Sequence, residues 1–222
     1  MQHAIIVAGG KGSRFGSDTP KQFLPLAGKP VLMHTIEKFA ACHGTHITVV
    51  LPAQFIEWWN DLCKEYGFTI RHRVVTGGDS RYASVKNALD TTKANDADLV
   101  AIHDGVRPLA SQHLIAQAFA EADKYGSAIP VVAVTDSIRR ITDCHGHSVA
   151  LSRDTLRAVQ TPQTFRLAEI KQAYSNGYSP SYTDDASVYE ANGGTIHLID
   201  GEVSNIKITH PNDLAIAELL MK

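Results

Sequence analysis

The stretch that decides the fold is His3-Ala4-Ile5-Ile6-Val7-Ala8-Gly9-Gly10-Lys11-Gly12-Ser13-Arg14-Phe15-Gly16, continued by Pro20-Lys21-Gln22-Phe23. Residues 4–8 form a short apolar run, which is typical of a parallel strand buried on both faces. The glycines at 9, 10 and 12 allow a sharp turn and let the backbone approach a ligand closely. Amide groups on such a loop bind anions, and Arg14 and Lys21 add positive charge. The pattern favours a strand, a loop and a helix that together bind a polyphosphate.

Two common phosphate loops do not match this stretch. The dinucleotide fingerprint G-x-G-x-x-G would need a glycine where Phe15 stands, and no register supplies the P-loop pattern G-x-x-x-x-G-K-[ST]. A glycine-rich turn kept only for packing is the alternative. Arg14 and the triplet Pro20-Lys21-Gln22 favour the functional interpretation.

Apolar runs alternate with helical patterns along most of the chain. Strands are expected at 46–51, 71–75, 98–103, 127–134, 195–199 and 205–209. The alternation predicts an α/β, Rossmann-like fold with a mostly parallel sheet flanked by helices. Turns at Gly9, Gly77 and Asp104 follow strand carboxyl ends, where such sheets bind ligands, so the three turns are expected to line one cleft.

Residues 137–153 break this rhythm and read as a β-hairpin. An isolated two-stranded ribbon is marginally stable in water, so it must pack on something, and another protomer is a suitable partner. We therefore expect one domain over 1–222, with an inserted dimerisation β-hairpin arm at about 135–153.

Composition excludes several classes of protein. A net charge of −2 over 222 residues gives no reason to expect nucleic acid or a membrane surface as a partner. Three cysteines without C-x-x-C spacing indicate a reducing compartment, and a strand that begins almost at once leaves no room for a signal peptide, so a cytoplasmic location is expected. Cys144, His145 and His147 lack a fourth ligand, so a zinc site is not expected.

Five segments resemble the 2-C-methyl-D-erythritol 4-phosphate cytidylyltransferase family, within the sugar-phosphate nucleotidyltransferases. They are the first stretch, His103-Asp104-Gly105-Val106-Arg107-Pro108, Gln160-Thr161-Pro162-Gln163-Thr164-Phe165, Thr183-Asp184-Asp185-Ala186-Ser187 and Asn205-Ile206-Lys207-Ile208-Thr209. The resemblance covers essentially the whole chain. It implies that CMP is transferred from CTP to 2-C-methyl-D-erythritol 4-phosphate and that pyrophosphate is released, for non-mevalonate isoprenoid synthesis.

The resemblance also implies residue roles. Arg14 and Lys21 match the positions that bind the triphosphate and stabilise the transition state, in agreement with catalysis by positioning and charge neutralisation. CTP would be held by Ala8, Gly9, Gly10, Gly12, Gly78, Asp79, Ser84 and Asp104. The acceptor phosphate would be held by Ser137, Arg153, Thr183 and Lys207, with Arg107 nearby. Mg²⁺ would arrive largely with the nucleotide, and Asp104 is its candidate protein ligand, since one carboxylate suffices for a hard ion that keeps phosphates and waters.

The match departs from the family pattern at two places, and two alternatives stay open. Ser137 stands where threonine is commoner, and Gly105-Val106 replaces a frequent Ala-Ala or Ala-Val. The same chemistry on ribitol 5-phosphate or another pentitol phosphate is the nearest alternative, and the 183–187 segment and the short length favour the erythritol substrate. A non-catalytic nucleotide-binding regulator would not need a second phosphate site such as Arg153 and Lys207.

Overall fold

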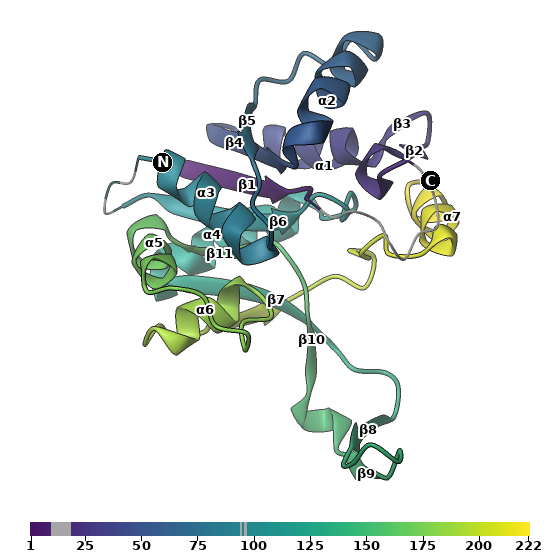
Figure 1. The fold of residues 1–222 in the computed structure, drawn as a ribbon, viewed down its shortest axis with the longest axis vertical. Helices are drawn as coiled ribbons and strands as arrows, with labels where there is room; N and C mark the ends of the chain where they lie inside the picture. Colours follow the sequence, from purple (N-terminus) through teal and green to yellow (C-terminus); the bar gives the residue numbers. More distant parts are fainter. Residues whose placement is uncertain (10–18, 94, 96) are drawn as a thin grey trace.

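The computed structural model describes residues 1–9, 19–93, 95 and 97–222, and the predicted roles of Gly10, Gly12 and Arg14 therefore lie outside the described residues. The main sheet has the strand order β10-β7-β11-β6-β1-β4-β5, with β12 beside β7 (Figure 1). Its strands are β1 (Gln2–Val7), β4 (Thr45–Leu51), β5 (Arg73–Thr76), β6 (Leu99–Asp104), β7 (Ser127–Ala133), β10 (Arg157–Val159), β11 (Gln163–Arg166) and β12 (Leu198–Asp200).

The centre of this sheet is parallel, as predicted. β1 pairs in parallel with β4 on one side and with β6 on the other, and β4 pairs in parallel with β5. β11 is antiparallel to both β6 and β7, and β10 is antiparallel to β7. The sequence did not predict β10 or β11.

Two apolar layers cover the sheet because side chains alternate along β1. Ala4 and Ile6 pack with α1 (Val31–Ala40), α2 (Ala53–Glu65) and α4 (Gln112–Tyr125). Ile5 packs with α3 (Arg81–Thr91), α5 (Leu167–Ser175) and α6 (Asp185–Ala191). All three β1 side chains are at most 1% exposed, so the strand is buried on both faces as the apolar run predicted.

The smaller elements fill the side of the molecule near the C-terminus. The short helix η1 (Lys21–Phe23) precedes the two-residue strands β2 (Pro25–Leu26) and β3 (Lys29–Pro30). The last helix, α7 (Pro211–Leu220), lies beside β2 and β3 (Figure 1). In the described part of the chain, no helix is long and apolar enough to span a membrane.

The predicted hairpin exists and stands apart from the sheet. β8 (Ile138–Ile141) and β9 (Ser148–Leu151) pair only with each other, and the short helix η2 (Arg153–Thr155) follows. Figure 1 shows this arm projecting from the end of the body, joined to it through β7 and β10. Its apolar side chains remain in solvent, since Ile141 is 63% exposed and Val149 is 42% exposed.

The strand predicted at 205–209 is absent. Residues 205–209 form no strand, and the Ile208 amide instead donates to the Val106 carbonyl. The N-cap of α6 is Asp184, because the Asp184 side chain accepts from the Ser187 amide and the Ser187 hydroxyl accepts from the Asp184 amide. Of the two tryptophans of α2, Trp59 is buried and Trp58 is 39% exposed.

Candidate active site

Glycines at the carboxyl ends of β1 and β5 lie around Ser84. The Gly78 amide donates to the Ser84 Oγ at 3.1 Å, and a Cβ on Gly9 would lie 3.7 Å from the same oxygen. A Cβ on Gly78 would lie 2.5 Å from the Ala83 Cβ, so only glycine fits without a shift of the backbone. The predicted nucleotide residues Ala8, Gly9, Gly78 and Ser84 are thus gathered in one place. Asp79, in the same turn, is exposed.

Lys21 is brought to this place by its neighbour. Gln22 is buried, and its amide group donates to the Ala8 carbonyl at 2.9 Å. Lys21 begins η1 immediately before it. The end of β1 and the predicted catalytic lysine are therefore adjacent in the described chain, as their common motif implied.

Asp104, the last residue of β6, is the centre of a charge cluster. Its Oδ2 lies 3.1 Å from the Lys207 Nζ and 3.2 Å from the Arg107 Nε, and its Oδ1 lies 3.9 Å from the Arg81 Nε. The residue is 7% exposed. Burial disfavours the charged carboxylate, but Lys207, Arg81 and Arg107 outweigh burial and hold the pKa of Asp104 well below its usual range. Asp104 therefore stays ionised.

Arg107 is committed inside the protein. Besides its contact with Asp104, its Nη1 donates to the Asn205 carbonyl at 2.7 Å, and its side chain is 11% exposed. Lys207 follows that carbonyl by two residues and keeps 43% of its side chain exposed. Of these two predicted acceptor-site cations, Lys207 is the one open to a ligand.

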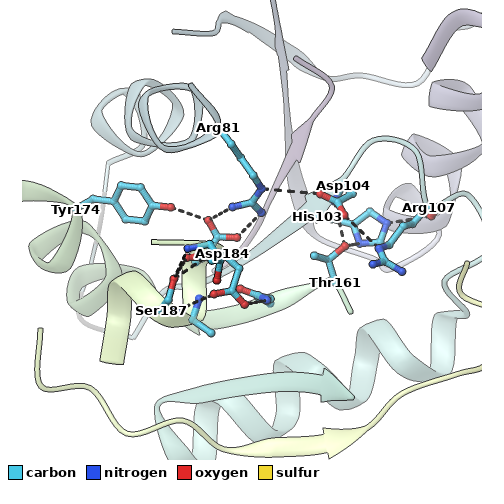
Figure 2. A network of polar contacts seen from close by, with 12 residues as sticks. Arg81, His103, Asp104, Arg107, Thr161, Tyr174, Asp184 and Ser187 are labelled. Carbon is cyan, nitrogen blue, oxygen red and sulfur yellow. Dashed lines mark hydrogen bonds and ion pairs between the residues drawn. The ribbon is translucent and has the colours of Figure 1, made fainter. Parts of the chain in front are cut away.

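A chain of neutral hydrogen bonds fixes the backbone beneath Asp104 (Figure 2). The Asp104 amide donates to the Thr161 Oγ1 at 3.1 Å, and that hydroxyl lies 3.0 Å from the His103 Nδ1. The His103 Nε2 lies 3.0 Å from the Arg107 carbonyl, which can only accept. Nε2 therefore carries the proton and Nδ1 accepts from Thr161. Burial lowers the pKa of His103 to about 4, so the ring is neutral at pH 7.

A second ion pair lies next to this chain and was not predicted from sequence. Arg81 donates from Nη1 to the Asp185 Oδ1 at 2.8 Å and from Nη2 to the Asp185 Oδ2 at 2.5 Å. Tyr174 donates its hydroxyl to the Asp185 Oδ1 at 2.6 Å. Burial opposes the charged guanidinium, but Asp185 and Asp104 outweigh it and raise the pKa of Arg81. Asp185 falls inside the segment 183–187 that the sequence marked, but its pairing with Arg81 has no local pattern.

The other predicted acceptor-site residues are Ser137, Arg153 and Thr183. Within one chain, the fold does not bring them next to Asp104. Ser137 and Arg153 lie at the two ends of the projecting hairpin and are exposed. Arg153 donates from Nη1 to the Thr135 carbonyl at 2.5 Å, at the base of the arm. Thr183 is exposed, and its amide donates to the Ser187 Oγ at 3.0 Å beside the start of α6.

Asp104 is also the candidate protein ligand for a metal ion. Among the described residues, no group of three or more His, Cys, Asp or Glu side chains could hold a metal ion. Asp104 presents one carboxylate oxygen, Oδ1, that is beyond hydrogen-bond distance of its nearest cation. A magnesium ion that kept phosphate oxygens and waters as its other ligands would fit this single carboxylate.

Comparison with known proteins places the whole chain among relatives of one kind. The family profile described as IspD, 2-C-methyl-D-erythritol 4-phosphate cytidylyltransferase, matches residues 2–222. The 2-C-methyl-D-erythritol 4-phosphate cytidylyltransferase of Bacteroides thetaiotaomicron is 47% identical over 221 residues, which cover 99% of each chain.

Solved structures agree with this comparison. The 4-diphosphocytidyl-2C-methyl-D-erythritol synthase from Anaerococcus prevotii superposes with a TM-score of 0.83 at 26% identity, covering 99% of this chain and 97% of that one. The cytidylyltransferase from Francisella tularensis superposes with a TM-score of 0.82 at 29% identity, covering 99% of both chains.

Proposed function

Since the chain belongs to the 2-C-methyl-D-erythritol 4-phosphate cytidylyltransferase family and is a nucleotidyltransferase, we propose that the cleft around Ser84, Lys21 and Asp104 carries out its reaction. The reaction is transfer of CMP from CTP to 2-C-methyl-D-erythritol 4-phosphate, with release of pyrophosphate. The observation that carries the proposal is the contact of Lys207 with Asp104. A cation that is 43% exposed lies 3.1 Å from a buried carboxylate at the carboxyl end of β6.

We propose the following roles in the reaction. A phosphate oxygen of the acceptor attacks the α-phosphorus of CTP in line, the new P–O bond forms, and the bond to the leaving pyrophosphate breaks. Arg14 and Lys21 neutralise charge on the triphosphate, which is the main contribution a protein makes to such transfers. Lys207 and Thr183 orient the acceptor phosphate, which carries a charge of roughly −1.5 to −2 at pH 7. Arg107 acts through Asp104, because two of its guanidinium nitrogens are already bound.

The nucleotide is proposed to lie on the two glycine turns. Ala8, Gly9, Gly10 and Gly12 would line the triphosphate side, and Gly78, Asp79 and Ser84 the cytosine side. Gly78 lies where a Cβ would meet Ala83, so its turn can lie close against α3. We propose that this close turn forms a pocket sized for a pyrimidine. Magnesium is proposed to arrive bound to CTP, with Asp104 as its protein ligand; it would supply further charge neutralisation on the phosphates.

We further propose that the arm at about 135–153 pairs two copies of this single-domain chain into a homodimer and lends Ser137 and Arg153 to the partner's acceptor site. The exposed apolar side chains of the hairpin and the exposure of Arg153 support this. A two-fold dimer satisfies the geometry because each copy lends what it borrows. The cytoplasm is the proposed compartment, which the free thiols of Cys42, Cys63 and Cys144 support.

The assay that tests the function supplies CTP, Mg²⁺ and one polyol phosphate at a time and measures pyrophosphate. We expect release with 2-C-methyl-D-erythritol 4-phosphate and little with ribitol 5-phosphate; the reverse preference would assign the chain to pentitol phosphates. ATP and GTP should support little turnover. UTP should be rejected because uracil lacks the amino group of cytosine, so the protein group that pairs with this amino group would be left unpaired.

Loss of one of the two phosphate-loop cations tests the site. Lys21→Ala and Arg14→Ala should each lower kcat by about 10²–10³, the usual effect of removing one preorganised charge donor. Circular dichroism would establish that the variants are folded. Folded variants with near-normal turnover would remove these two residues from the site.

A further inference from the structure

The Arg81–Asp185 ion pair joins two parts of the cleft that are 104 residues apart in sequence. It is a two-bond fork on a carboxylate that is fully buried, and the Tyr174 hydroxyl supplies a third donor. Arg81 also reaches Asp104 through its Nε, a contact drawn as a dashed line in Figure 2. A fork of this kind fixes direction as well as distance.

Each end of the pair belongs to a different half of the proposed cleft. Arg81 is the first residue of α3, directly after the glycine turn proposed to hold cytosine. Asp185 is the first residue of α6, two residues after Thr183 of the proposed acceptor site. The Arg81 Nε also reaches Asp104 at 3.9 Å, and Asp104 in turn contacts Lys207. Arg81 therefore contacts both carboxylates that lie next to proposed acceptor residues.

The nucleotide side is held without this pair. The Ser80 hydroxyl caps α3 by accepting from the Ala83 amide at 3.0 Å, and Val85, Ala88 and Leu89 anchor the helix in the core. The seven-residue α6 is capped as well, and Gln163 bonds to the Asp184 side chain and to the Ala186 amide. The fork on Asp185 links this same turn to Arg81 of α3 and, through Arg81, to Asp104. Loss of the fork should therefore disturb the acceptor side more than the nucleotide side.

We infer that Arg81 is a positioning residue that holds Asp185 and Asp104 in register, and through them sets Thr183 and Lys207 for the acceptor phosphate. The inference rests on the proposed function and deepens it, because it names what couples the two substrate half-sites. The alternative is that the pair serves only to pack α3 against α6.

The test compares three variants of the full chain by steady-state kinetics, calorimetric titration of CTP alone, and thermal unfolding. Arg81→Lys keeps the charge but cannot form the fork. Asp185→Asn keeps the shape but removes the charge, and Tyr174→Phe is the matched control because it removes one hydrogen bond from the same carboxylate oxygen and leaves the fork intact.

Arg81→Lys and Asp185→Asn should each raise the KM for the acceptor phosphate by about tenfold, the size of one charge-assisted hydrogen bond. The KM and calorimetric Kd for CTP should stay within about threefold, and the double variant should be no worse than either single one, because both remove the same coupling. Tyr174→Phe should leave both KM values near those of the wild type.

Several results would overturn the inference. One is unchanged KM values in folded Arg81→Lys and Asp185→Asn, and another is a parallel rise of the KM for both substrates. An equal effect of Tyr174→Phe on the KM values, or failure of both Arg81→Lys and Asp185→Asn to fold, would overturn it as well. Absence of CMP transfer by the wild-type protein would instead remove the proposed function, so the two failures are distinguishable.

Discussion

The cluster around Asp104 and the arm both carry proposed acceptor-site cations, yet they differ in how one chain uses its charges. Asp104 is 7% exposed and lies within 4 Å of three cationic side chains. Arg153 in the arm is exposed and contacts the Thr135 carbonyl at the base of the same arm. A single chain therefore completes the charge balance of the first region, whereas the second presents charge for something outside it. Mutation of the first region should lower stability as well as activity, whereas mutation of the second should lower activity with little change in stability.

The largest expected effect is on stability at the cluster. Asp104→Ala should lower the free energy of unfolding by about 3–5 kcal/mol, because it leaves the buried guanidinium of Arg107 without its carboxylate. Urea denaturation of the purified protein would measure the change.

The matched control is Asp143→Ala in the arm, since that carboxylate also accepts backbone bonds, from His145 and His147, but is exposed. Its cost should stay below about 1 kcal/mol, as expected for a solvent-exposed site. Equal costs at the two positions would remove the distinction between the regions.

A second expected effect is on how the free energy of unfolding depends on pH through His103, next to Asp104. The pKa of His103 is about 4 in the folded protein, against 6.5 for an ordinary histidine, so the unfolded chain binds the proton more readily between these values. The contribution of neutral His103 to the free energy of unfolding is fully present above pH 6.5 and is lost as the pH falls toward 4. Its maximum is about 3 kcal/mol, from 1.36 kcal/mol per pKa unit.

Unfolding of wild type and His103→Gln across this range would measure that contribution. The pH slope of the free energy of unfolding should be shallower in His103→Gln than in the wild type. A variant that kept the full wild-type slope would show that His103 is not the titrating group.

The smallest expected change in stability is in the arm. Arg153→Ala should alter the free energy of unfolding by less than about 0.5 kcal/mol, yet it should abolish most activity if the arm serves a partner. Mixing the Arg153→Ala and Arg14→Ala variants shows whether Arg153 acts in the partner's acceptor site or in that of its own chain. Under random exchange half the dimers are mixed and each holds one intact site, so about a quarter of wild-type activity should return. A mixture that exchanges subunits but stays inactive would place Arg153 in its own chain's site.

Sequence alone was sufficient where a local pattern carries the structure. The apolar run of β1, the bend after Gly78 and the hairpin all appear where they were expected. In each case the backbone requirement is met by neighbouring residues, so the pattern is visible without knowledge of distant contacts.

Sequence failed where partners far apart decide the outcome. β10 and β11 have only three and four residues, and they exist because β7 and β6 supply their pairing. Residues 205–209 alternate like a strand, but Ile206 and Ile208 pack beside α7 instead of joining the sheet. The Arg81–Asp185 pair had no local signal for the same reason. Thr183 and Asp184 are both suitable caps, and the choice depends on Ser187 three residues after Asp184.

The separation of the arm from the sheet has a consequence for how the protein behaves on dilution. Under the proposed exchange of arms, a chain without a companion keeps its fold and its nucleotide turns but lacks half of its acceptor site. Turnover per chain then follows mass action and falls once the total concentration drops below the dissociation constant of the pair. Addition of an inactive chain with an intact arm should raise it again, so that the reaction rate itself becomes a measure of association.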